Sequence, residues 1–400
     1  MMPRALLTSE SVTEGHPDKL ADRISDAVLD AILTEDPTAR VACETFLTSG
    51  LVLVGGEITT TAYVDIDRLC RRVIASAGYD KADYGFNYQD CAVLSAIKEQ
   101  SPEIAAAVEK AQEVRSRKAE DPYDRLGAGD QGIVYGYACS ETRERMPLPI
   151  MLAHSLTRRL AAVRKDGTLP YLRPDGKSQV TVEYEGGAPR RVSIVILAAQ
   201  HDPDTSQERL HEDLLQTVIR PTLGTWMDDR TEVLINSSGS FVIGGPASDT
   251  GMTGRKIAVD TYGGYGSHGG GAFSGKDSSK VDRSGSYMTR YVAKNLVAAG
   301  LAREVEVQVA YAIGKAHPVS VTVDAGGRGA ASDEQLLRAV CQVFDFRPAA
   351  IIERFGLFLP IYEPFSSYGH FGRSEDEAPW ERTDRTDELL QALPKQRRIA

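Results

Sequence analysis

The chain has 400 residues, of which 42% are hydrophobic and 26% are charged, proportions typical of a soluble globular protein with two or three domains. Its formal net charge of −10 argues against non-specific binding of nucleic acid or anionic membranes, so any anion site must be a local cationic pocket. The five cysteines are scattered and include no CxxC pair, which argues against structural zinc and disulfides. The sequence has no signal-type start and no apolar run near the ~18 residues that a membrane span needs, so we expect a cytoplasmic protein.

The first hundred residues predict an α+β unit. Short or alternating apolar runs indicate strands, and apolar residues at a period of about 3.6 residues indicate helices. The predicted strands are residues 6–10, 41–47, 51–54 and, after a bulge, 55–58, and the predicted helices are residues 20–33, 66–77 and 91–97.

Polar residues interrupt this unit at two places where a ligand could bind. His16, Asp18 and Lys19 would cluster at the N-terminus of the helix, where partial positive charge favours an anion, but they also fit a capped helix start with solvated charges. Glu44 and Glu57 fall within apolar strands, where a buried carboxylate needs a partner, or else on the exposed face of an edge strand. The residues alone leave both questions open.

A charged segment at 101–126 predicts a linker or a mobile lid between domains, because it holds few large apolar residues and a proline. A solvated surface helix over 103–118 explains the part before the proline equally well. A glycine-rich turn at 127–132 then leads into an apolar strand at 133–138. Asp130 within this turn either contacts a ligand or only shapes the turn.

The rest of the chain predicts two more units of the same kind. The predicted helices are residues 149–164, 206–219 (ending at a proline), 284–299 and 333–344, and the predicted strands are residues 179–184, 191–197, 231–236, 257–260, 305–313 and 319–323. Lys177 lies at the base of the central hairpin, and the sequence is polar from residue 374, with a disordered basic end expected at 395–398. The whole pattern predicts three similar α+β domains, each a sheet with helices on one face.

Within residues 262–283, a run rich in glycine extends from 263 to 275. Lys276, Asp277, Lys280 and Asp282 follow it at once. Glycine is concentrated where backbone bends sharply or approaches a ligand, while bare N–H groups and lysines suit phosphate and aspartate can hold Mg²⁺. The segment therefore predicts a site for a polyphosphate and a metal. Residues 270–276 fit the GxxxxGK spacing of a P-loop, but Asp277 stands where a P-loop needs Ser or Thr; a flexible linker is the other alternative.

Six sequence blocks together resemble the S-adenosylmethionine synthetases, or methionine adenosyltransferases. They occur in the family's order between about residues 8 and 373: GHPDK (15–19), GAGDQG (127–132), RPDGKSQV (173–180), FVIGGP (241–246), GRKI (254–257) and GGGAFSGKD (269–277). GAGDQG followed by an apolar strand and GGGAFSGKD are the two signatures of that family.

The resemblance implies three pseudo-symmetric α+β domains in a homo-oligomer, either a dimer or a dimer of dimers (a homotetramer), with active sites between subunits. The expected parts are an N-terminal domain (1–101), a mobile gating loop (102–126), a central domain (127–238), a C-terminal domain (239–374) and a polar tail (375–400).

The implied enzyme transfers an alkyl group other than methyl. The methionine sulfur attacks C5′ of ATP and expels the triphosphate, which is then hydrolysed to diphosphate and phosphate. A thioether is nucleophilic without losing a proton, so no general base is required. The barrier lies in aligning sulfur with C5′ and in stabilising charge on the triphosphate, which favours a site rich in lysine, arginine, histidine and metal.

The resemblance also implies roles for individual residues. His16 would donate a hydrogen bond to the oxygen between C5′ and the phosphates, Asp18 and Asp282 would hold two Mg²⁺ ions, and Glu44 would bind K⁺. The implied catalytic set is His16, Lys177, Arg255 and Lys276. ATP and its triphosphate would contact His16, Asp175, Lys177, Ser240, Phe241, Asp249, Arg255, Lys256, Ala272, Lys276 and Lys280. Methionine would contact Glu57, Gln100, Asp130, Asp249 and Lys280.

The chain departs from the family's pattern at residues 237–240, where Ser-Ser-Gly-Ser replaces the common Pro-Thr-Gly-Arg. Ser240 therefore replaces an arginine expected near the nucleotide, and the gating loop is long and highly charged. These departures leave two alternatives open: a specialised paralogue with relaxed use of methionine analogues, and an impaired nucleotide-binding subunit. A kinase-like P-loop enzyme is a third alternative, based on the GxxxxGK spacing at 270–276.

Overall fold

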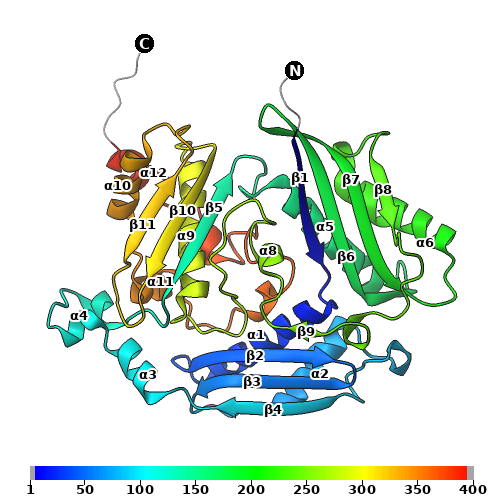
Figure 1. The fold of residues 1–400 in the computed structure, drawn as a ribbon, viewed down its shortest axis with the longest axis horizontal. Helices are drawn as coiled ribbons and strands as arrows, with labels where there is room; N and C mark the ends of the chain where they lie inside the picture. The colour runs from blue at the N-terminus through cyan, green and yellow to red at the C-terminus, as the bar shows by residue number, and fades with distance from the viewer. Residues whose placement is uncertain (1–4, 394–400) are drawn as a thin grey trace. The chain divides into compact units, whose positions relative to one another are not determined.

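The structure is a computed structural model that describes residues 5–393, so the basic end predicted at 395–398 lies outside the described residues. The chain divides into two compact units. Unit 1 comprises the chain up to Lys98, Leu148–Gly264 and Pro360–His370, and unit 2 comprises Glu99–Pro147, Tyr265–Leu359 and the chain from Phe371. Of the three sheets drawn in Figure 1, two belong to unit 1 and one to unit 2.

The first sheet of unit 1 has the strand order β4-β3-β2-β9. β2 (Arg40–Thr48) and β3 (Leu51–Thr59) are antiparallel, β4 (Ala92–Lys98) runs parallel to β3, and β9 (Gly251–Met252) pairs with β2. One face of the sheet packs on α1 (Pro17–Glu35) and α2 (Ile66–Ala77) (Figure 1). The helix predicted at 91–97 is wrong, because this apolar run becomes strand β4 by pairing with β3, a contact that local spacing does not reveal.

The second sheet of unit 1 has the order β1-β6-β7-β8, and its strands are β1 (Ala5–Val12), β6 (Leu172–Glu185), β7 (Ala188–His201) and β8 (Glu232–Ile235). α5 (Leu148–Lys165) packs on β1 and β6. α6 (Gln207–Leu214) continues through a π-helical turn, Leu215–Ile219, into α7 (Arg220–Leu223). The helix therefore passes through Pro221 instead of ending there, since the wider turn accommodates a residue without an N–H donor.

Unit 2 holds a three-stranded antiparallel sheet in the order β11-β10-β5, made of β5 (Gly132–Cys139), β10 (Glu304–Tyr311) and β11 (Ser320–Asp324). The long helix α9 (Val281–Ala298) packs on β5 and β10. The other helices of this unit are α3 (Pro102–Glu109), α4 (Gln112–Arg115), α10 (Asp333–Val343), α11 (Pro348–Phe355) and α12 (Thr386–Ala392). Residues beyond 374 add apolar core as well as polar surface: Trp380 is fully buried and stacks on Tyr287 with ring centroids 3.7 Å apart.

Each sheet takes a strand from a distant part of the sequence. β1 opens the chain yet pairs with β6 along its whole length, β5 pairs with β10, and β9 is an edge strand beside β2. The α+β class with three domains is confirmed, whereas the exact domain boundaries stay a prediction. None of the helices within residues 5–393 combines the length and hydropathy that a membrane span requires.

Candidate functional site

His16 is the N-cap of α1, which starts at Pro17. Its Nδ1 accepts the backbone N–H of Asp18 at 3.2 Å. A ring nitrogen that accepts a hydrogen bond carries no proton, so the proton of this histidine lies on Nε2. Burial, followed by the charge of Lys256, lowers the pKa of His16 to about 3, which agrees with a neutral ring. His16 therefore caps the helix with one nitrogen and carries an N–H donor on the other.

Asp18 accepts hydrogen bonds from β9 and from the loop that follows it. Its Oδ1 accepts the backbone N–H of Met252 at 3.0 Å, its Oδ2 accepts Lys256 Nζ at 2.6 Å, and Arg255 Nε lies 3.6 Å from Oδ1. Burial alone would raise the pKa of Asp18, but the bonds from Lys256 and Met252 outweigh it and lower the pKa. An ionised carboxylate, two cations and a neutral imidazole therefore share the start of α1.

A buried charge network holds this loop in place. Sequence reasoning placed Lys19 among the candidate anion-binding residues and gave Asp22 and Asp260 no role. Asp22 Oδ1 accepts the backbone N–H of Gly254 at 2.8 Å, while Lys19 Nζ donates to Asp22 Oδ2 at 2.8 Å and also to Asp260. The side chains of Lys19 and Asp22 are fully buried. Because Lys19 bonds to both carboxylates, it ties the two ends of the segment that carries Arg255.

Asp260 also explains an error in the predicted secondary structure. The strand predicted at 257–260 is wrong: these residues form a helical turn, α8 (Ile257–Asp260). The turn directs Asp260 to Lys19, and the Asp260 carbonyl accepts the backbone N–H of His370 at 2.9 Å. The β-branched residues of this run favour a strand, but a run this short is ambiguous by spacing alone, and the tertiary contacts of Asp260 decide for the helical turn.

The sequence did contain a signal for this network. Aspartates recur every four residues at 18, 22, 26 and 30, which places them along one face of α1. Such a stripe is usually a solvated face, yet Asp18, Asp22 and Asp26 are all at most 1% exposed. Three carboxylates spaced along a mostly apolar helix therefore indicated buried partners.

β6 brings two more predicted residues to the start of α1. A Cβ added at Gly15 would lie 2.4 Å from the Pro174 carbonyl oxygen, so only glycine allows this turn to pack directly on the strand. Asp175 Oδ2 accepts the backbone N–H of Gly245 at 2.8 Å, and burial raises its pKa to about 6. Lys177 is half-exposed and lies 2.6 Å from Glu10 Oε2.

The FVIGGP loop follows β8 and contacts the end of β7. The Phe241 backbone N–H donates to His201 Nε2 at 3.2 Å, and the His201 N–H donates to the Phe241 carbonyl at 3.0 Å. Ser240 and Asp249 are exposed at the two ends of this loop, and the charge of Asp249 contributes to the raised pKa of Asp175. The structure thus brings together Asp175, Asp249, Lys177, Lys256 and the start of α1.

Glu44 and Glu57 lie apart from that group, on the sheet of β2 and β3. Glu44 pairs with Gly55 and Glu57 with Ala42, so the two carboxylates share the sheet face opposite α1 and α2. Both strands are internal to the sheet, so the edge-strand alternative is wrong, although the exposed face is correct. Glu57 Oε1 lies 3.2 Å from Lys98 Nζ.

The remaining predicted residues lie in unit 2, where the glycine segment leads into α9. Lys276 Nζ contacts Asp282 Oδ2 at 2.7 Å, and Lys280 Nζ contacts Asp277 Oδ2 at 2.5 Å. A Cβ at Gly271 would lie 2.2 Å from the carboxyl carbon of Asp282. The segment that includes Ala272 therefore folds tightly over this aspartate.

The GAGDQG turn packs against the same segment. The Gly129 N–H donates to the Ser279 carbonyl at 2.9 Å, and Asp130 is exposed beside it. Gln100 lies between β4 and α3. A P-loop is contradicted, because the glycine segment follows the helical turn α8 instead of a strand, and Asp277 bonds to Lys280.

Comparison with known proteins identifies the family of this chain. Models of the S-adenosylmethionine synthetase N-terminal, central and C-terminal domains match residues 4–102, 125–241 and 243–382. The chain belongs to the S-adenosylmethionine synthetase family. Two proteins named S-adenosylmethionine synthase, from two strains of Thermus thermophilus, are each 60% identical to it over 386 residues, or 96% of this chain and 97% of theirs.

The S-adenosylmethionine synthetase family is generally metal-dependent, and the donors of this chain can be tested against Mg²⁺. Within residues 5–393, no three His, Cys, Asp or Glu side chains form a preassembled metal cluster. Mg²⁺ is commonly bound by one or two carboxylates together with substrate phosphates and water, so Asp18 and Asp282 each supply the type of ligand that Mg²⁺ needs. Each carboxylate also contacts a lysine that suits the phosphates.

A cavity of about 630 Å³ in unit 1 lies between α1 and residues 360–368, and its wall includes Arg23, Asp30 and Arg72. It contains none of the predicted site residues. In this synthetase the candidate site is indicated by charge and backbone geometry.

Proposed function

We propose that this chain joins ATP and L-methionine to form S-adenosylmethionine, with release of phosphate and diphosphate. S-adenosylmethionine synthesis from these substrates is the activity of the family to which the chain belongs. The observation that carries the mechanism is the bond from the Asp18 N–H to His16 Nδ1, which leaves the ring proton on Nε2 beside Lys256 and Asp18. A neutral donor among cations suits cleavage of a carbon–oxygen bond without a general base.

In this proposal His16 Nε2 donates to the oxygen between C5′ and the triphosphate as that bond breaks. Lys177, Arg255 and Lys256 stabilise the charge that accumulates on the leaving group. Lys276 and Lys280 hold the same triphosphate, and Asp175, Ser240, Phe241, Asp249 and Ala272 surround the nucleotide. Subsequent hydrolysis of the triphosphate would use the same cations.

The metals in this proposal are two Mg²⁺ ions, held by Asp18 and Asp282, and one K⁺, held by Glu44. Bound Mg²⁺ supplies electrostatic stabilisation to the phosphate oxygens. Glu44 is exposed on a sheet face, so a hard monovalent ion could reach it without a buried charge being created.

Methionine binding is assigned to Glu57, Gln100, Asp130, Asp249 and Lys280. The carboxylates suit the methionine ammonium and, after transfer, the sulfonium. We further propose a cytoplasmic homo-oligomer, a dimer or a dimer of dimers, whose active sites lie between subunits. Residues 102–126 are assigned as the gating segment.

Incubating the purified chain with ATP and methionine, with and without Mg²⁺ and K⁺, tests this function by product mass. S-adenosylmethionine with diphosphate and phosphate is the expected outcome, and it should depend on Mg²⁺. Phosphate transfer to an acceptor would indicate a kinase, and bound ATP without product would indicate an impaired subunit. The two relatives from Thermus thermophilus give no support to the specialised paralogue. Steady-state constants for ATP and methionine equal to those of an enzyme that carries the arginine would contradict it.

A further inference from the structure

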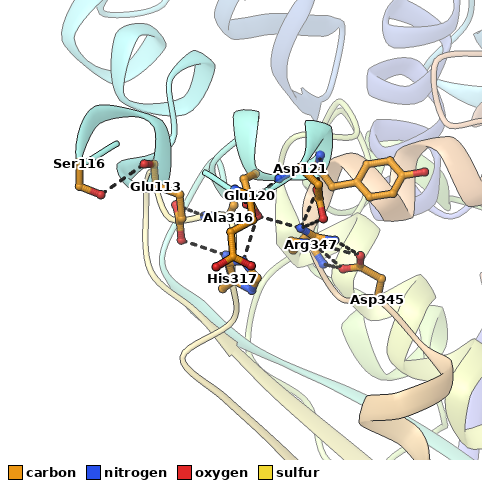
Figure 2. Close-up of polar contacts among 10 residues, drawn as sticks. Glu113, Ser116, Glu120, Asp121, Ala316, His317, Asp345 and Arg347 are labelled. Atoms are coloured by element: carbon orange, nitrogen blue, oxygen red, sulfur yellow. Dashed lines mark hydrogen bonds and ion pairs between the residues drawn. The ribbon is translucent and has the colours of Figure 1, made fainter. Parts of the chain in front are cut away.

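The segment proposed as a gate is part of unit 2, and its second half is fastened to the rest of that unit. Its second half carries α4 and a single 3₁₀ turn, Pro122–Arg125. Figure 2 shows this half beside the connection from β10 to β11 and the connection from α10 to α11. The fastening uses both backbone and charged side chains.

Backbone hydrogen bonds form the first part of the fastening. The Gln112 N–H donates to the Gly314 carbonyl at 2.8 Å, and the Gly127 N–H donates to the Val108 carbonyl at 2.9 Å. Glu113 accepts the backbone N–H groups of Ala316 at 3.0 Å and His317 at 3.3 Å. Val108 and Ala111 are buried at 3% and 0% exposure, so these contacts begin at the last turn of α3.

Arg347 forms the second part. Its Nη1 donates to both carboxylate oxygens of Asp121 and to Oδ1 of Asp124, each at 2.8 Å, and its Nε donates to Asp345 at 3.0 Å. Figure 2 shows Asp121 and Asp345 pointing toward this one guanidinium. His317 Nε2 also lies 2.9 Å from Asp124 Oδ1.

The geometry makes Arg347 essential to the arrangement. Three carboxylates face it, and Asp124 is only 1% exposed, so removing the guanidinium would leave the buried Asp124 charge beside two more exposed carboxylates without its cationic partner. Burial would raise the pKa of Asp124, but hydrogen bonds from the Glu120 N–H and from Arg347 lower it to about 2. Asp124 is therefore ionised whenever the protein is folded near neutral pH.

We propose that Arg347 is a positioning residue that clasps residues 108–126 to the rest of unit 2, so that any movement of the gating segment pivots within residues 99–107. The functional consequence rests on the proposed function, because it assumes that the segment closes over substrate. A released segment would spend less time in the closed position, which lowers apparent substrate affinity in proportion. The clasp therefore acts on KM more than on kcat.

Hydrogen exchange of the full chain without substrate tests the clasp directly. In Arg347→Gln, the amides of residues 108–126 should exchange at least about tenfold faster than in the wild type, while those of α9 stay unchanged. Asp121→Asn should shift the same amides in the same direction but less, because Asn can still accept the Tyr123 N–H that Asp121 accepts now. Arg338→Gln, which alters an exposed arginine on α10, is the matched control and should match the wild type.

Unchanged exchange over 108–126 in both clasp variants would overturn the proposal, as would equal protection of 99–107 and 108–126 in the wild type. If Arg347→Gln does not fold, Asp121→Asn decides. In the active enzyme Arg347→Gln should raise the KM values for ATP and methionine about fivefold or more, with kcat changed less than about threefold. A wild-type chain that makes no S-adenosylmethionine would end the proposed function, while the exchange result would still judge the clasp.

Discussion

Nδ1 of His16 accepts the backbone N–H of Asp18, 3.2 Å away, so the residue that caps α1 holds its proton on the opposite nitrogen. One hydrogen bond therefore serves two purposes. It satisfies a helix-terminal N–H, and it sets the tautomer that the proposed reaction needs. The two purposes can be separated by substitution.

His16→Asn should separate the cap from the donor. Asparagine is among the best N-caps, and its oxygen can take the place of Nδ1, so we expect little change in the melting temperature. The side chain is too short to replace Nε2, and we expect kcat to fall by about 10²–10³. Steady-state kinetics and thermal unfolding on the same preparation measure both effects, and a kcat within threefold of wild type would contradict the assigned role.

Asp22→Ala should loosen the loop that carries Arg255 and Lys256. The change removes the acceptor of the Gly254 N–H and one of the two carboxylates that bond to buried Lys19. Breaking a buried ion pair from one side costs about 3–5 kcal/mol, and we expect a loss near the lower end because Asp260 remains.

Denaturant unfolding of Asp22→Ala, beside steady-state KM for ATP, provides the measurement. Asp67→Ala is the control, since Asp67 pairs with Arg71 on the exposed surface of α2, where solvent screens the pair and little loss of stability is expected. Equal losses in the two variants would show that the buried network does not hold the loop.

Gly271→Ala should displace Asp282. The new Cβ would lie 2.2 Å from the carboxyl carbon of that aspartate, which no real contact allows. We expect the Mg²⁺ concentration for half-maximal activity to rise about tenfold or more, while the fold is retained. Gly132→Ala is the comparison, because its Cβ would meet the same carboxylate at an ordinary 3.6 Å. Similar Mg²⁺ dependence in the two variants would exclude Asp282 as a metal ligand.

Asp175→Asn should change how stability depends on pH. Burial raises the pKa of Asp175 from the ordinary 3.8 to about 6, so the folded protein holds this proton to higher pH than the unfolded chain does. The stability contributed by the protonated form is present below pH 4 and is lost as the pH rises through 6.

Relative to Asp175→Asn, the wild type should therefore lose unfolding free energy on the order of 2–3 kcal/mol between pH 4 and pH 7. Urea unfolding of both proteins at half-unit intervals measures the difference. A difference that stays constant over this range would show that Asp175 titrates as it does in the unfolded chain.

Local sequence pattern was sufficient to predict many of the helices, strands and motifs of this protein. The 3.6-residue period of α1 and α9, the paired strands β2 and β3, and the dense glycine run all follow from residue spacing and backbone freedom. The motif blocks around His16, Lys177 and Lys276 indicated the family and its chemistry before any contact was seen. Residue spacing gave the wrong secondary structure at β4 and α8. In such short apolar runs the intrinsic preference for helix or strand is weak, and contacts with neighbouring elements override it.

Only the tertiary structure showed which strands pair and which charged side chains meet when they are far apart in the sequence. β1 pairs with a strand more than 160 residues later, Lys19 bonds to Asp260, and Arg347 gathers Asp121 and Asp124. Spacing describes which face a residue occupies on its own element, but pairing and burial depend on what the other elements bring. The sequence by itself therefore determined the elements and the chemical groups, and the fold decided which charges are buried, which carboxylate each lysine meets and which carboxylates surround Arg347.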